Sequence, residues 1–327
     1  MNLSIVTTLY CSAPHLEEFY ARVCKVAEAL ADDFEIILVN DGSPDGSQEI
    51  ALQLYRRDPR VRVVELSRNF GHHKAMMTGL SYARGDLVFL VDSDLEEEPE
   101  TLKKFHERME ATGADVVFGV QQKRKGAIFE RISGAIFFKL FNALSTNPIP
   151  QNVVTARLMS RKYVRALVQH QERETLIAGL WTITGFKQVS VPITKFHRSA
   201  STYNLRKKIS HFVNAITSFS SKPLVLIFYL GCVILGLSII AAVDLILRKL
   251  IFGTLLAGWP SLIVSIWLLG GLTIFCLGVI GIYLSKVYIE VKQRPYTIVR
   301  EVYEQVPAPP ELSTGDEQID WANRNSP

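Results

Sequence analysis

The chain has 327 residues, of which 48% are hydrophobic and 21% are charged, and its formal net charge at pH 7 is +4. This length is sufficient for about two domains. The small net charge gives no reason to expect a nucleic-acid partner, and the lack of a GxGxxG fingerprint or a lysine-containing phosphate loop disfavours dinucleotide enzymes and P-loop nucleotidases.

The first 120 residues alternate between strand and helix patterns. Short apolar runs predict strands at residues 3–9, 34–40, 61–66, 86–91 and 116–120. Helical patterns predict helices at residues 15–30, 48–55, 74–83 and 99–111. This alternation is typical of an α/β fold in which helices cover both faces of a mostly parallel sheet.

Two amphipathic helices with basic flanks are predicted further along, at residues 128–144 and 205–219. For the first, packing into a protein core is about as well supported as any other role. The second leads directly into a long apolar stretch, which favours a position in the membrane interface. The tail after residue 305 is rich in proline and acidic residues and is expected to be disordered.

Two long apolar stretches occupy residues 224–247 and 262–284; the first contains one charged residue, Asp244, and the second contains none. Each exceeds the roughly 20 residues that a helix needs to cross a bilayer. We therefore expect a hairpin of two membrane-spanning helices. The alternative is a helix pair buried in a soluble core, where uncharged runs of this length are rare.

Basic residues flank these stretches unevenly. The region that connects them offers Arg248 and Lys249, whereas eight basic residues lie outside: Arg206, Lys207, Lys208, Lys222, Lys286, Lys292, Arg294 and Arg300. Because cytoplasmic flanks carry the excess of Lys and Arg, both termini are predicted to be cytoplasmic. The predicted organisation is an α/β domain at residues 1–203, an interfacial helix at 204–222, a transmembrane hairpin at 223–287 and a cytoplasmic tail at 288–327.

Asp92-Ser93-Asp94 follows the apolar run at residues 87–91. An all-apolar run predicts a buried strand, so both carboxylates would emerge at its carboxyl end, where open α/β sheets bind ligands. Two carboxylates so close together predict a site for Mg²⁺ or Mn²⁺ completed by substrate phosphates. The alternative is a solvated acidic turn, because an acidic run continues to Pro99 and could open a helix.

Asn40-Asp41-Gly42-Ser43 ends the second predicted strand and would bring Asp41 to the same sheet edge. A carboxylate there can accept hydrogen bonds from a base or ribose, and Gly42 would let the backbone approach a ligand. An Asp-Gly turn alone means little. Its combination with Asp92-Ser93-Asp94 is much more specific.

With these motifs in view, the chain resembles the family 2 glycosyltransferases of the GT-A fold, which is Rossmann-like with a mostly parallel sheet. More narrowly, it resembles the polyprenyl-phosphate glycosyltransferases, which include dolichol-phosphate mannose synthase, bactoprenol glucosyltransferase and undecaprenyl-phosphate aminoarabinose transferase. The resemblance extends from residue 3 to about residue 296. It rests also on Ser67-Arg68-Asn69-Phe70-Gly71, Gly85-Asp86, Leu95-Glu96 before Pro99, Arg157 with Ser160-Arg161, and Glu172-Arg173.

The resemblance implies roles for individual residues. Asp41 would bind the nucleotide base, and the other nucleotide-sugar contacts would come from Thr8, Tyr10, Ser43, Asp92 and Ser93. Asp92 and Asp94 would hold the metal and the diphosphate, with Glu96 as a further metal ligand. Asp94 and Arg157 would be catalytic. The phosphates of the donor or the lipid would meet Arg124, Arg131, Arg157 and Arg198.

Three departures from the family pattern bear on chemistry. Cys11-Ser12 replaces Asn-Glu, and Ser201-Thr202-Tyr203 replaces Ser-Lys-Tyr in the closing loop. Residues 150–154 replace a Gly-Asp-x-Gly pattern, so only Gln151 and Asn152 remain as polar contacts where relatives offer an acidic residue that is a proposed catalytic base. A hydroxyl acceptor would need a general base, whereas a phosphate monoester, with its second pKa near 6, arrives anionic. The departure therefore favours a lipid-phosphate acceptor.

The predicted activity is inverting transfer of one sugar from a nucleotide-diphosphate sugar to a polyprenyl phosphate at the cytoplasmic leaflet, with a bacterial inner membrane as the expected location. The alternatives are a lipid hydroxyl acceptor and a non-catalytic, membrane-anchored scaffold that binds nucleotide sugars. Homo-oligomers could form through the spans. His72 and His73 could approach a phosphate, although for such residues a surface or core role is at least about twice as common.

Overall fold

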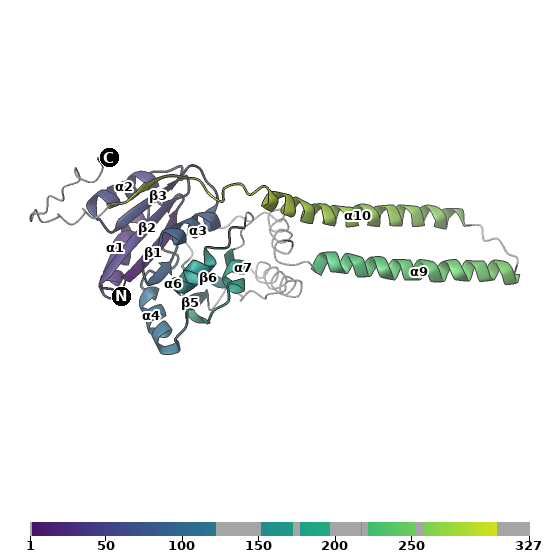
Figure 1. Ribbon diagram of the computed structural model, residues 1–327, viewed down its shortest axis with the longest axis horizontal. Helices are drawn as coiled ribbons and strands as arrows, with labels where there is room; N and C mark the ends of the chain where they lie inside the picture. The colour runs from purple at the N-terminus through teal and green to yellow at the C-terminus, as the bar shows by residue number, and fades with distance from the viewer. Residues whose placement is uncertain are drawn as a thin grey trace, which may run out of the picture.

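The computed structural model describes residues 2–121, 152–172, 177–196, 217, 222–252 and 258–305 (Figure 1). The described residues form one eight-stranded sheet in the order β7-β5-β6-β4-β1-β2-β3-β8. Its strands are β1 (Asn2–Leu9), β2 (Asp33–Asn40), β3 (Val61–Leu66), β4 (Leu87–Leu90), β5 (Val116–Gln121), β6 (Val153–Ser160), β7 (Gln188–Ile193) and β8 (Val299–Tyr303).

The sheet is mostly parallel, as predicted. β1 pairs in parallel with both β2 and β4, and β2 pairs in parallel with β3. β6 runs antiparallel to its neighbours β4 and β5, so β5 points the same way as β4, and β7 runs parallel to β5. β8 closes the other edge, antiparallel to β3. All the strands predicted from the sequence are therefore confirmed, with ends that differ by one residue at most.

Alternate residues of the central strands face opposite sides of the sheet and build two hydrophobic cores. One face carries Ile5 and Phe89 and is covered by α1 (Leu16–Glu28), α2 (Ser47–Arg57) and α4 (Thr101–Thr112). The other carries Val6 and Leu90 and is covered by α3 (His72–Tyr82), α6 (Arg161–Leu167) and α7 (Ile177–Ile183). Helices α1 to α4 confirm the predicted helices, and the two-faced covering confirms the α/β architecture.

The last three strands were not predicted, each for a physical reason. β6 has a charged residue, Arg157, at its centre, and β7 contains Pro192, which sheets tolerate only at edges. β8 is half exposed and alternates charged with apolar residues. It lies in the segment 288–327, which is predicted to be a cytoplasmic tail, but its residues belong to the sheet.

Two long helices, α9 (Lys222–Phe252) and α10 (Trp259–Val291), contact each other and project together away from the sheet (Figure 1). Among the described residues, Ser265–Val291 is one stretch long and apolar enough to cross a membrane, and a shorter apolar stretch occupies Lys222–Ile234. Large apolar side chains of both helices are exposed; Trp267, for example, is 79% exposed. The predicted helices at 128–144 and 205–219 and the predicted disorder after residue 305 lie outside the described residues, apart from Thr217.

Candidate active site

Polar segments from three strands meet at one edge of the sheet, as the sequence predicted. Since β1, β2 and β4 are parallel neighbours, Thr8, Asp41 and Asp92 all lie at their carboxyl ends. Direct contacts join the segments: the Ser93 hydroxyl donates to the carbonyl oxygen of Thr8 at 3.0 Å, and the Asp41 N–H donates to that of Leu9 at 3.1 Å. This edge is therefore the candidate active site.

Asp92 lies beside His72, the first residue of α3. The His72 Nε2 atom is 3.3 Å from Asp92 Oδ1, and the His72 Nδ1 atom is 2.9 Å from the hydroxyl of Thr8. Burial opposes the charge of Asp92, but the hydrogen bond and the charge of His72 outweigh it and hold the pKa of Asp92 below its ordinary value. Burial likewise opposes the charge of His72, and Asp92 raises the pKa of His72 above its ordinary value.

Asp94 caps a tight turn that begins the acidic run. Leu95 adopts a left-handed backbone with φ of 58°, and the Glu96 N–H donates to Asp94 Oδ1 at 2.9 Å. Burial raises the pKa of Asp94, and the negative charges of Asp92 and Glu96 add to this effect. The turn thus brings negative charges together at the end of a buried strand, where their mutual repulsion is only partly compensated.

Lys195, two residues after β7, supplies positive charge to this acidic run. Its Nζ atom lies 3.2 Å from Glu96 Oε2 and 3.5 Å from Glu97 Oε1. Glu97 is fully buried and accepts hydrogen bonds from the backbone N–H groups of Thr155 and Ala156 on β6. Burial, with the charge of Asp92, raises the pKa of Glu97 to about 7. Glu97 and Lys195 therefore tie the acidic loop to β6 and β7.

Serine hydroxyls connect the loops that follow β1, β2 and β4. The Ser93 Oγ atom lies 2.9 Å from Ser12 Oγ, and the Ser12 N–H donates to the Ser47 hydroxyl at 3.0 Å. Asp45 Oδ1 accepts hydrogen bonds from the Ser43 hydroxyl, at 2.6 Å, and from that of Ser47. Ser43 and Ser93 thus have structural partners here, and their contact with a nucleotide stays a prediction.

Asp41 anchors the loop before α3. Its Oδ1 and Oδ2 atoms accept hydrogen bonds from the backbone N–H groups of Phe70 at 2.7 Å and Gly71 at 3.0 Å. The side chain is only 2% exposed, and burial raises its pKa. Tyr10, predicted to lie around the same nucleotide pocket, is 54% exposed at the end of β1. The predicted contact of Asp41 with a base would have to share these carboxylate oxygens with the loop.

Arg157 is not brought together with the carboxylates. It is 1% exposed, its guanidinium donates to the carbonyl oxygens of Val154 and Thr155, and it stacks over the ring of Trp181. Burial lowers its pKa to about 9. Arg124, Arg131 and Arg198 lie outside the described residues, as does Gln151. The predicted phosphate contacts of these arginines therefore stay predictions.

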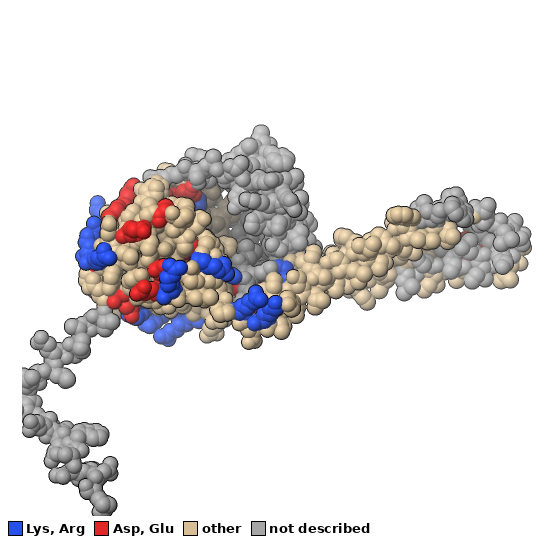
Figure 2. All heavy atoms as spheres, turned by 90° about the horizontal axis from the view of Figure 1, so that it is seen from above, with Lys and Arg blue, Asp and Glu red and all other residues tan. Residues whose placement is uncertain are grey.

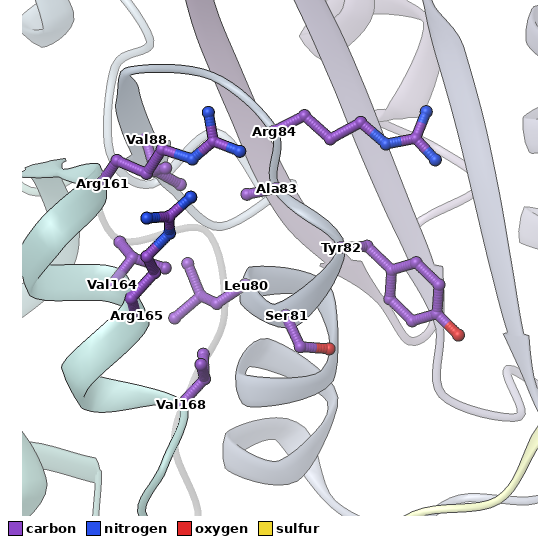
Figure 3. Close-up of a pocket in the computed structure, with 10 residues that line it drawn as sticks. All are labelled: Leu80, Ser81, Tyr82, Ala83, Arg84, Val88, Arg161, Val164, Arg165 and Val168. Atoms are coloured by element: carbon purple, nitrogen blue, oxygen red, sulfur yellow. The ribbon is translucent and has the colours of Figure 1, made fainter.

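A hollow in the described residues lies elsewhere, and Figure 3 shows its lining. It encloses about 360 Å³ beside the C-terminal end of α3 and the start of α6, with Arg161 and Arg165 at its rim. His72, which contacts Asp92, is at the opposite end of α3. The hollow holds none of the predicted site residues, so the carboxylate edge remains the candidate site.

Comparison with known proteins identifies the family. The model of glycosyl transferase family 2 matches residues 4–168. The chain belongs to this family. A Mycobacterium tuberculosis (strain CDC 1551 / Oshkosh) protein with a provisional glycosyltransferase name is 54% identical over 303 residues, 93% of this chain and 89% of the relative. The predicted resemblance is confirmed, and this family 2 chain is a glycosyltransferase.

Two further relatives match the family 2 chain over nearly its whole length. The uncharacterised glycosyltransferase YkcC of Bacillus subtilis (strain 168) is 35% identical over 93% of this chain and 94% of its own. The SfII prophage-derived bactoprenol glucosyl transferase of Shigella flexneri is 34% identical over 92% of this chain and 98% of its own.

The solved structures that match this glycosyltransferase have low sequence identity to it. Mannosyltransferase PcManGT from Pyrobaculum calidifontis, in complex with GDP-Man and Mn²⁺, is 17% identical, with a TM-score of 0.47 over 65% of this chain and 62% of that chain. S. aureus TarS 1–349, in complex with UDP-GlcNAc, is 18% identical, with a TM-score of 0.43 over 67% of this chain and 66% of that chain.

Asp92 and Asp94 of the family 2 chain fit a hard divalent cation by their chemistry. Both present carboxylate oxygens at a crowded, negatively charged strand end, where a cation would remove like-charge repulsion. Among the described residues, no three His, Cys, Asp or Glu side chains form a metal-binding group. Mg²⁺ is ordinarily held by one or two carboxylates together with water and phosphates, so a pair suffices. Glu96, the predicted third ligand, pairs with Lys195.

Part of this site does not follow from the sequence. The acidic run offers Glu97 only as one of several acids that could open a helix, and no motif indicates Lys195. For His72 the sequence favours a surface or core role, although the residue contacts both Thr8 and Asp92. Its position directly after Gly71, at the start of a helix that follows a strand end, is the signal that could have raised it.

Proposed function

We propose that this glycosyltransferase moves one sugar, with inversion, from a nucleotide-diphosphate sugar to a polyprenyl phosphate of undecaprenyl or dolichyl type at the cytoplasmic membrane face. A UDP-sugar is the first donor to test. The observation that carries the proposal is the Asp92 and Asp94 pair at the sheet edge of a family 2 chain that also carries a long apolar helix. The bactoprenol glucosyl transferase relatives support the acceptor class.

The acceptor would need no general base. A phosphate monoester is already anionic at neutral pH, because its second pKa is near 6. In the described part of the site, the buried Glu97 side chain accepts hydrogen bonds from backbone N–H groups and Glu96 forms an ion pair with Lys195, so both carboxylates already have structural partners. Asn152, in the segment where relatives carry an acidic residue, has a left-handed backbone with φ of 58°, and its backbone carbonyl oxygen accepts a hydrogen bond from the Gln121 N–H. These features suit a nucleophile that needs positioning and not deprotonation.

The residues at the sheet edge would divide the remaining work. Asp92 and Asp94 would hold the cation, Mg²⁺ or Mn²⁺, which when bound neutralises charge on the departing nucleoside diphosphate. Thr8, Tyr10 and Asp41 would surround the nucleoside. The arginines predicted for the phosphates would hold donor and acceptor anions close together despite their repulsion.

Membrane attachment would bring the site to its lipid substrate. The described side chains of α9 and α10 that Figure 2 shows are mostly uncharged, whereas basic side chains gather where the helices meet the sheet domain. Lys222 begins α9, and Lys292 and Arg294 follow α10. Such residues interact favourably with anionic headgroups of the cytoplasmic leaflet. We propose that α9 and α10 both span the membrane, and that copies of the chain can associate through them.

The test is a transfer assay with the purified full chain, undecaprenyl phosphate, labelled nucleotide sugars and Mg²⁺ or Mn²⁺. Label should enter the lipid fraction with at least one donor. Asp94→Asn should reduce the rate by at least about 100-fold, the scale of a lost electrostatic contribution at a reacting centre. Asp33→Asn is the matched control, because Asp33 is an exposed acid at the start of β2, the opposite end of the strands.

Other outcomes separate the alternatives. Label in a phosphate-free lipid would assign a hydroxyl acceptor. Donor binding without transfer, unaffected by Asp94→Asn, would indicate the non-catalytic scaffold. If no donor in a broad panel labels any lipid, the proposed function is wrong.

A further inference from the structure

His72 links two strand ends through a single imidazole ring. Its Nε2 atom faces Asp92 Oδ1 at 3.3 Å, and its Nδ1 atom faces the Thr8 hydroxyl at 2.9 Å. A carboxylate can only accept, so Nε2 carries a hydrogen; in the neutral ring, Nδ1 then accepts from Thr8. The ring therefore fixes the orientation of Asp92 relative to the end of β1.

The backbone that carries His72 is itself fixed. The two N–H groups immediately before it, those of Phe70 and Gly71, both donate to Asp41 at the end of β2. Gly42 packs so closely on this loop that an added Cβ atom would lie 2.6 Å from the Asn69 nitrogen. Hence β1, β2 and β4, together with the loop after β3, all contribute to where the imidazole lies.

The exposure of the pair suits a ligand on the open side. The His72 side chain is 48% exposed and that of Asp92 is 17% exposed, so the bridge lies at the mouth of the site and not in the core. A carboxylate offers about four lone-pair sites, so one hydrogen bond from His72 leaves others for a cation. Groups that orient metal ligands in this way ordinarily change metal affinity by about 10–100-fold when they are removed.

We propose that His72 is a positioning residue that aims the Asp92 carboxylate at the divalent cation and couples it to the nucleotide-binding end of β1 through Thr8. This inference rests on the proposed function, because it requires that Asp92 holds a metal. It assigns His72 no proton transfer and no contact with the reacting atoms. Removal of the imidazole should therefore weaken metal binding while leaving the fold intact.

The experiment measures the dissociation constant for Mn²⁺ by electron paramagnetic resonance, using the full chain in detergent with saturating UDP or GDP, whichever the wild type binds. His72→Ala should weaken Mn²⁺ binding by about 10–100-fold. His72→Gln, which retains an N–H donor, should recover part of the loss. His106→Ala is the matched control, because His106 also pairs with a carboxylate, Glu110, but lies on α4. It should leave Mn²⁺ affinity unchanged.

Turnover gives a second reading that a purely structural role would not produce. If His72 acts through metal affinity, excess Mn²⁺ should restore the kcat of His72→Ala towards that of the wild type, and the midpoint of thermal unfolding should barely change. Equal Mn²⁺ affinities for the wild type and His72→Ala would overturn the inference. Should His72→Ala fail to fold, an unchanged affinity in His72→Gln together with wild-type kcat at limiting Mn²⁺ would do the same. A wild type that binds no Mn²⁺ with either nucleotide would instead count against the proposed function.

Discussion

Gly42→Ala tests whether the loop before α3 is held rigidly against the sheet edge. Gly42 has φ of 61°, a left-handed conformation that costs a residue with a Cβ atom roughly 1–2 kcal/mol. The added Cβ would also lie 2.6 Å from the Asn69 nitrogen and 2.7 Å from the Arg68 carbonyl carbon. These are backbone atoms, so the loop must retreat by roughly 1 Å to reach van der Waals distance.

That retreat lengthens the hydrogen bonds from the Phe70 and Gly71 N–H groups to Asp41. A hydrogen bond to a charged group contributes about 1.5–3 kcal/mol, so the loss of most of one such bond adds about 2 kcal/mol to the backbone cost. We therefore expect Gly42→Ala to lower the free energy of unfolding by about 3–4 kcal/mol.

Gly113→Ala provides the control. Gly113 has φ of 58°, almost the same as Gly42, but a Cβ added there meets nothing within 4 Å. It should pay only the backbone cost, so the two variants should differ by about 2 kcal/mol or more. For a domain of this size, that difference is about 4–8 °C in the midpoint of thermal unfolding, measured by circular dichroism of the full chain in detergent. Equal midpoints for the two variants would refute the reasoning, because the loop would then yield without cost.

Three further predictions concern the contacts of Asp45, Lys195 and Arg300. Burial opposes the charge of Asp45, but hydrogen bonds from Ser43, Ser47 and the Ala13 N–H lower its pKa to about 2. The charged Asp45 side chain therefore stabilises the fold fully above its ordinary pKa of 3.8, and this stabilisation is lost as the pH falls towards 2. Asp45→Asn should abolish about 1–2 kcal/mol of this acid-dependent stability, seen as a smaller fall in unfolding free energy than the wild type shows between pH 4 and pH 2. Lys195→Met should lower the unfolding free energy by about 3 kcal/mol at pH 8, because it removes the positive charge beside two buried carboxylates, Glu96 and Glu97. Chemical denaturation measures this change, and no loss would contradict the role of Lys195. Arg300→Ala, which removes an ion pair to Glu65 at 2.7 Å, should speed proteolytic cleavage near β8 severalfold and leave cleavage elsewhere unchanged.

A strand, helix or site residue of this protein could be predicted from the sequence only where its signal lies within a short window of residues. β1 to β5 and the helices between them are predicted by apolar patterns within short windows of sequence. Once the strands are known to be parallel, their carboxyl ends must lie at the same edge of the sheet. That is why Asp41, Asp92 and Asp94 could be placed together before any coordinates. β7 contains a proline and β8 has a half-polar face, and both are strands only because they pair with neighbouring strands at the edges of the sheet.

The missing parts of the site are non-local for the same reason. Lys195 meets Glu97 only because β7 lies beside β5 and the chain after it returns to the acidic loop, where the Phe196 N–H donates to the Glu96 carbonyl oxygen. His72 meets Asp92 because α3 begins over the ends of β1 and β4. A lone histidine at a helix start has many ordinary roles, so periodicity and motif spacing could not single it out.

The path of the chain after α10 bears on whether the carboxylate edge can reach a lipid headgroup. Thr297 lies only six residues beyond the end of α10, and its hydroxyl is 2.8 Å from that of Thr78 in the middle of α3. Six residues span at most about 22 Å, and the six from Thr78 back to His72 span about 9 Å of helix. The two threonine side chains and their hydrogen bond add roughly 7 Å, so the residue that contacts Asp92 is within about 40 Å of Val291, the last residue of the apolar stretch, whatever the orientation of the domain. If α10 spans the membrane as proposed, Lys292 and Arg294 would mark the polar boundary in between, and the gap from the carboxylate edge to the headgroups would be shorter than this bound.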